Sequence, residues 1–139
     1  MKRVDVYFLL LATVLLVCGA LLGIVMGARE DFQLVPVHAH LNLIGFVTIF
    51  LAAIYYRLVP AAAAHPLARY HTAVSVIGAV LFPIGIACVL LGGHDRFEPV
   101  VIAGALTVLL GMLLFVVVVF RTSGTRQINN AEPPLRNVA

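Results

Sequence analysis

The sequence predicts an all-α, integral membrane four-helix bundle, and three observations support this prediction. Of the 139 residues, 63% are hydrophobic and only 11% are charged, whereas soluble domains are about half apolar and a quarter charged. The mean hydropathy is +1.10. Four uncharged stretches are each as long as the roughly 20 residues that a helix needs to cross a hydrocarbon core. They are too long and too uniformly apolar for the strands of a membrane barrel.

The predicted helices follow one another with short connections. The first follows Met1-Lys2-Arg3, and we expect it to be retained and not cleaved as a signal peptide, because its apolar core is longer than the roughly 7–15 residues of such a region and no A-x-A site follows it. Residues 1–121 form the predicted membrane domain, and residues 122–139 a polar, flexible cytoplasmic tail. The four helices are expected at residues 6–26, 36–56, 72–92 and 100–120.

The distribution of Lys and Arg predicts the orientation. The side with more of these residues is normally the cytoplasmic one, which puts both termini in the cytoplasm of a bacterium and the bundle in its inner membrane. The formal net charge of +3 is therefore a topology signal, and we expect no nucleic-acid partner. One side holds Lys2, Arg3, Arg57, Arg69, Arg121, Arg126 and Arg136, and the other holds Arg29 and Arg96.

Glycines recur on one face of three predicted helices. Small residues let helix backbones approach closely in lipid. Two interpretations remain open: packing within one chain, or an interface in a homo-oligomer such as a dimer or trimer. The stripes are Gly19, Gly23 and Gly27; Gly78, Gly85 and Gly92; and Gly104 and Gly111.

The five histidines divide between the two membrane faces. His38, His40 and His94 belong to the outer side. On the inner side, His65 is expected in a loop and His71 as an interfacial anchor. Ionisable residues within membrane spans are costly and usually functional, which makes His40, two residues deeper than His38, the stronger candidate ligand.

The spacing of His38 and His40 limits what they can bind together. Two residues on a helix differ by about 200° in direction, so the two rings suit two separate sites, or one site and a supporting contact. One chemistry that fits is heme b held by one histidine from each of two facing helices. The alternative is copper bound by His38, His94 and Asp95 at the outer face. No Ser/His/Asp set, paired intramembrane carboxylates or phosphate-binding glycine loop supports catalysis.

The segment VHAHLNLIGFVTIFLAAIYYRLVP, with its H-x-H pair, Gly45 and an aromatic end closing in Pro60, resembles the tenth helix of subunit I of the heme–copper oxidases, which include nitric oxide reductases. The following segment, YHTAVSVIGAVLFPIGIACVLLGGHDRF, is similar to the eleventh helix of that subunit. The chain as a whole resembles the last group of four helices in the subunit, helices nine to twelve. The resemblance implies that His38 ligates a high-spin heme iron and His40 a low-spin heme.

The chain departs from that family in one important respect. A complete oxidase site also needs three further metal-binding histidines and a second low-spin ligand, and five histidines divided between two faces cannot supply them. We therefore do not expect one copy to be a complete oxidase. Three copies would restore twelve helices, and a dimer with heme between two copies of the second helix is equally permitted.

The leading functional prediction is a small b-type heme protein of the membrane, serving electron transfer, redox or gas sensing, or heme handling. It would lie in lipid as a homo-oligomer, with a redox protein as a further partner, and His40, His38 and His94 are its candidate ligands. The alternatives are a copper-binding or copper-delivery protein of the periplasmic face, and a structural or assembly subunit of a respiratory complex.

Overall fold

A computed structural model describes residues 4–123, and this part of the chain is all-α, without strands. Four helical segments are long and apolar enough to cross a membrane, so the predicted four-helix membrane bundle is confirmed. The predicted tail lies outside the described residues from position 124 onward. The elements are α1 Val4–Arg29, α2 Val35–His40, η1 Leu41–Thr48, α3 Ile49–Leu58, α4 Pro60–Ala64, α5 Pro66–Gly92 and α6 His94–Ser123, and α2, η1 and α3 together make the second crossing.

Two of the helices begin earlier than their apolar stretches. α5 begins at Pro66, where a proline at the first helical position loses no hydrogen bond. The preceding His65 caps this helix, because its Nδ1 accepts a hydrogen bond from the Leu67 backbone N–H at 3.2 Å. α6 begins at His94, because Gly93 alone makes the turn from α5, with a φ of 104° that favours glycine.

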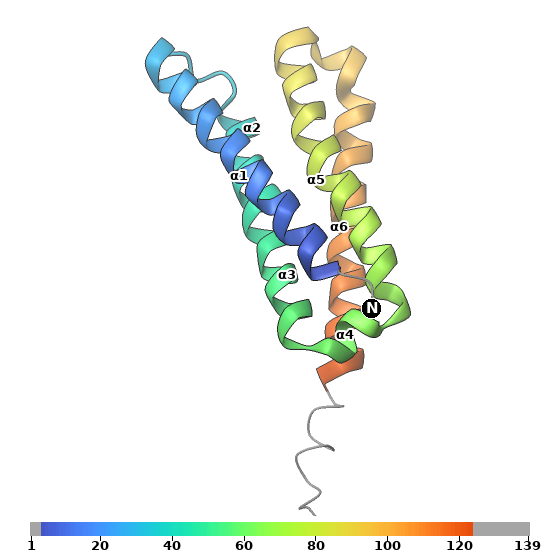
Figure 1. The fold of residues 1–139 in the computed structure, drawn as a ribbon. Helices are drawn as coiled ribbons and strands as arrows, with labels where there is room; N and C mark the ends of the chain where they lie inside the picture. Colours follow the sequence, from blue (N-terminus) through green and yellow to red (C-terminus); the bar gives the residue numbers. More distant parts are fainter. Residues whose placement is uncertain (1–3, 124–139) are drawn as a thin grey trace, which may run out of the picture.

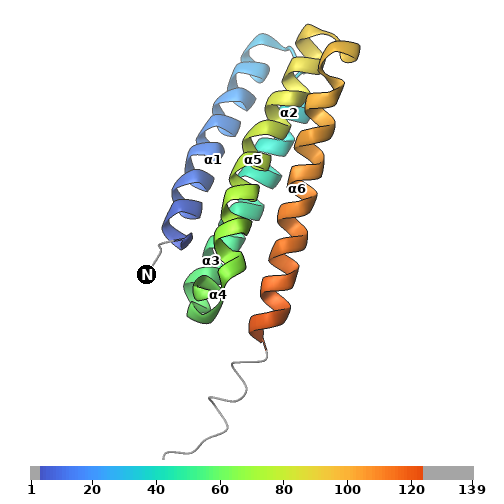
Figure 2. The same cartoon turned by 90° about the vertical axis from the view of Figure 1, so that its right-hand side faces the viewer.

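The crossings form two hairpins (Figures 1 and 2). α1 packs against η1 and α3, and α5 packs along α6. The short helix α4 connects the hairpins at one end, and near this end Arg57 of α3 pairs with Asp5 of α1 at 3.0 Å within the first hairpin. At the other end, the Gln33 side chain donates a hydrogen bond to the Leu90 carbonyl at 2.8 Å. The hairpins are therefore linked at both ends of the bundle.

Glycines bring α5 and α6 into close contact. A Cβ atom on Gly104 would lie 2.7 Å from the Cα atom of Phe82, and one on Gly78 would lie 3.0 Å from the backbone nitrogen of Val108. Gly85 faces the backbone of Val101 at a similar distance. These positions require glycine because the facing atoms are backbone and cannot rotate away.

The glycines of α1 face the second crossing. A Cβ on Gly19 would lie 2.7 Å from Oδ1 of Asn42, and one on Gly23 would lie 2.8 Å from Cε1 of His38. Nothing lies within 4 Å of a Cβ built on Gly27. The interpretation of the stripes as packing within one chain is therefore confirmed at Gly19 and Gly23, and these positions do not require a second chain.

The core is densest at the end of the bundle near α4. Phe8 of α1, Tyr56 of α3 and Val118 of α6 are fully or almost fully buried there. On the outer faces, by contrast, large apolar side chains are uncovered, as at Phe120, which is 80% exposed, and Ile24, which is 67% exposed. Such a surface is costly in water and suits lipid.

Candidate functional site

The second crossing changes its helical form directly after His40. Pro36 lies in the first turn of α2, where its missing N–H disrupts nothing. From Leu41 to Thr48 the backbone is a π-helix, and the Thr48 hydroxyl donates to the Leu43 carbonyl, five residues earlier, at 2.8 Å. π-helical turns are rare and frequent at functional sites. The histidine pair thus lies at the junction of two helical forms.

His40 is a half-buried side chain with one ring nitrogen engaged. Its Nδ1 lies 2.6 Å from the carbonyl oxygen of Pro36. Because a carbonyl only accepts, Nδ1 must carry the proton, which leaves the lone pair of the neutral ring on Nε2. The ring meets the edge of Phe82 on α5 at a centroid distance of 4.8 Å. Within residues 4–123, Nε2 has no hydrogen-bond partner.

His38 has both ring nitrogens engaged. Its Nδ1 donates to the Gly19 carbonyl of α1 at 2.8 Å, and its Nε2 lies 3.3 Å from the amide nitrogen of Asn42, which can donate to it. The same amide also donates to the His38 carbonyl at 2.9 Å. The ring lies over Gly23, where a Cβ would collide with it. These contacts make His38 a link between α1 and the second crossing.

The two histidines therefore face different neighbours, His38 toward α1 and His40 toward α5, as their helical spacing predicts. Their hydrogen bonds make His40 a better candidate ligand than His38. The arrangement at His40, with Nδ1–H on a carbonyl and Nε2 free, is the one that metal-ligating histidines adopt. For His38 to ligate iron, Nε2 would have to leave Asn42, and the ring would have to leave the surface of Gly23.

His94 and Asp95 lie apart from this pair. His94 starts α6, where its side chain is 68% exposed and its Nδ1 lies 3.9 Å from Asp95 and 3.7 Å from Glu98. In the part of the chain that the structure describes, no three His, Cys, Asp or Glu side chains are placed to hold one metal ion. The predicted grouping of His38, His94 and Asp95 is therefore not assembled within a single chain.

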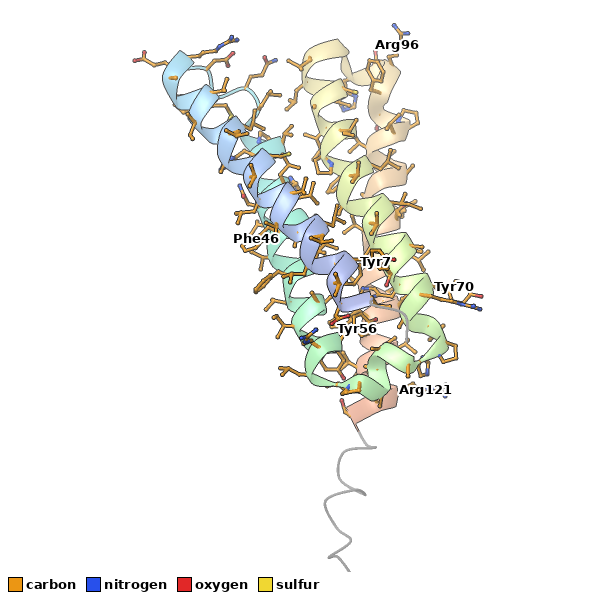
Figure 3. All side chains as sticks on the ribbon, viewed as in Figure 1. Tyr7, Phe46, Tyr56, Tyr70, Arg96 and Arg121 are labelled. Carbon is orange, nitrogen blue, oxygen red and sulfur yellow. The ribbon has the colours of Figure 1, made fainter. Side chains whose placement is uncertain are left out.

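His71 differs from its prediction. It was expected to be an interfacial anchor, but it is only 3% exposed and lies inside the bundle. Its neighbour Tyr70 does point outward, under the guanidinium group of Arg69, and Figure 3 shows it directed away from the helices. The His71 ring stacks on Phe115 of α6 at 5.1 Å and meets the edge of Phe8 at 5.2 Å.

A hydrogen bond fixes the tautomer of His71. The hydroxyl of Tyr56, itself 2% exposed, lies 2.8 Å from Nδ1. This nitrogen is the only acceptor for that hydroxyl within the described residues, and a buried hydroxyl without an acceptor is costly. Tyr56 therefore donates to Nδ1, which places the proton of the neutral ring on Nε2. The sequence gives little signal for this pair, because only the contact between α3 and α5 reveals it.

A cavity of about 160 Å³ lies beside His71. It is bounded by η1 and α3 on one side and by α5 and α6 on the other. Ser75, one turn after His71 and 9% exposed, also lines it. The rest of the lining is apolar, apart from Thr48. Its lining residues are Ile44, Thr48, Ile49, Ala52, His71, Ser75, Val108, Met112, Phe115 and Val116.

Comparison of the chain with protein-family models, curated proteins and solved structures gives no match.

Proposed function

We propose that this protein is a small b-type heme protein of the membrane and that His40 supplies one axial ligand through Nε2. The observation that carries the proposal is the hydrogen bond from His40 Nδ1 to the Pro36 carbonyl. It orients the ring and leaves the Nε2 lone pair available, as a histidine ligand requires. The π-helix that starts at the next residue supports the same site.

The second axial ligand comes from a second copy of the chain. His94 is an exposed side chain at the start of α6, and the ring nitrogens of His38 are engaged elsewhere. One His40 from each of two copies would hold a flat macrocycle between two second crossings, as bis-imidazole sites in helical bundles do. The support for a dimer is thus the incomplete ligand set and not the glycine stripes.

This ligand set favours electron transfer among the roles open to a heme protein. A heme with two histidine ligands carries single electrons and has no open position for a gas. We therefore propose a redox protein as its partner, and we do not propose a complete oxidase. The distribution of Lys and Arg supports an orientation with both termini in the cytoplasm, and we propose the bacterial inner membrane as the location. In Figure 3, Arg96 and Arg121 lie at opposite ends of the bundle, as this topology requires.

The test is the absorption spectrum of the detergent-purified protein, oxidised and reduced with dithionite, with copper measured on the same sample. A Soret band with sharp α and β bands after reduction supports the proposal. Copper without a Soret band would favour the copper-delivery alternative. The absence of both, with a larger membrane complex co-purifying, would favour the assembly-subunit alternative.

A further inference from the structure

We infer that the cavity beside His71 is a binding site for a lipid-soluble molecule whose single-ring head carries a hydrogen-bond-accepting oxygen, the class to which membrane benzoquinones belong. The site lies on η1, α3, α5 and α6. It is separate from the surface of His40, which faces Pro36 and Phe82, and the inference does not depend on the heme proposal.

Two buried polar groups open into this cavity. Neither Nε2 of His71 nor the hydroxyl of Ser75 has a hydrogen-bond partner among residues 4–123. Yet every fully buried side-chain nitrogen or oxygen in that part of the chain has a partner. Both atoms must therefore reach open space, and both residues line this cavity, with the Ser75 hydroxyl also lying against Gly111 of α6. Such groups are costly to leave unpaired in a membrane interior.

The two groups present donors to one side of the cavity. Because Tyr56 donates to Nδ1 of His71, Nε2 carries a proton that it can donate. The Ser75 hydroxyl, four residues later on the same face of α5, can donate a second one. An oxygen atom with two lone pairs, such as a carbonyl, can accept from both.

The size and the opening of the cavity indicate a ligand with a single ring and an apolar tail. Its volume of about 160 Å³ is close to the roughly 150 Å³ that accommodates one benzene ring in a protein interior. Met112 and Val116, which form part of the lining, are 41% and 47% exposed on the outer face of α6. The cavity therefore reaches the surface that faces lipid, and a ligand with an apolar tail can enter from the bilayer.

The test uses the methionines as reporters. Of the three methionines in the chain, Met112 lines the cavity, whereas Met26 is buried near the end of α1. The full-length protein, labelled with ¹³C-methyl methionine, is titrated in detergent micelles with a decyl-benzoquinone, and Met112→Leu assigns the signal. We expect a saturable shift at Met112 and none at Met26. Equal, unsaturable shifts at both would overturn the inference, because they would show partition of the ligand into detergent.

Two variants test the polar contacts. Ser75→Ala removes one donor and should weaken binding about 2- to 12-fold, the range expected for one hydrogen bond. His71→Asn keeps a hydrogen-bonding atom near Nδ1 for Tyr56 but removes Nε2, so it should weaken binding to a similar extent. His94→Ala, which changes an exposed side chain outside the cavity lining, is the control and should leave the titration unchanged.

A matched ligand completes the design. Decylbenzene has the ring and the tail but no acceptor oxygen. It should bind more weakly than the quinone, and Ser75→Ala should not change its affinity. Equal affinity for the two ligands, or unchanged quinone binding in both variants, would overturn the inference and identify the cavity as a space for lipid tails or water.

Discussion

The Nδ1 atom of His40 lies 2.6 Å from the carbonyl oxygen of Pro36, four residues earlier on the same helix. The carbonyl that accepts this hydrogen bond belongs to a proline at the start of α2. The ring is thereby fixed in one tautomer, with Nε2 as its free acceptor. By contrast, His38, two residues earlier, uses both nitrogens to connect α1 with the second crossing.

The heme-to-protein ratio should be one heme per two chains. If His40 of each copy supplies one axial ligand, a monomer cannot complete the site. Pyridine hemochrome analysis with amino-acid quantitation gives the ratio, and analytical ultracentrifugation in detergent gives the oligomeric state. His94→Ala is the matched control, since this exposed side chain should not affect either value. One heme per chain in a monomer would contradict the dimeric arrangement.

Gly104→Ala should destabilise the bundle by about 1–3 kcal/mol, the usual cost of overpacking. The added methyl group would lie 2.7 Å from the Cα atom of Phe82 and would force α5 and α6 apart. Gly27→Ala is the control, because nothing lies within 4 Å of its Cβ position and a helical Gly→Ala change is often stabilising. Unfolding in mixed dodecyl maltoside and SDS measures the free energy of unfolding of both variants. Equal changes in the two would contradict the close packing of α5 against α6.

Tyr56→Phe should cost more stability than Tyr55→Phe. Tyr56 makes a buried hydrogen bond to His71, and its removal leaves Nδ1 unpaired, at a cost of about 1–3 kcal/mol. The Tyr55 hydroxyl contacts the Thr122 hydroxyl at 2.9 Å, but Thr122 keeps its bond to the Val118 carbonyl. The same detergent titration compares the two variants. A larger effect at Tyr55 would show that the pairing of Tyr56 and His71 contributes little.

Hydropathy was sufficient to predict the four crossings, because a chain in lipid must satisfy its backbone within long apolar helices. The predicted ends of the helices were less accurate. α5 begins at Pro66 and not at residue 72, because the polar residues of its first turns lower the hydropathy without interrupting the helix. α6 begins at His94 because one glycine suffices for the turn. The π-helix of η1 was not predicted, since its composition is that of any apolar helix.

The candidate site was predictable only in part. The spacing of His38 and His40 predicted that they would face different directions, but their different hydrogen bonds depend on the position of α1. His71 was assigned to the interface because it lies next to Tyr70 at the start of the predicted third helix, and its burial depends on the packing of α3 and α6 against α5. Contacts between distant parts of the chain decided each of these outcomes.

The most direct test of His40 as a heme ligand is heme binding by His40→Ala compared with His38→Ala. Both variants remove one imidazole from the same turn of the second crossing, so general disruption should affect them similarly. Absorption spectra of the two purified proteins, with a heme titration of each, provide the comparison. We expect His40→Ala to lose the six-coordinate reduced spectrum, and His38→Ala to keep it with a less stable fold. Retention of that spectrum in His40→Ala would contradict the assignment of His40 as an axial ligand.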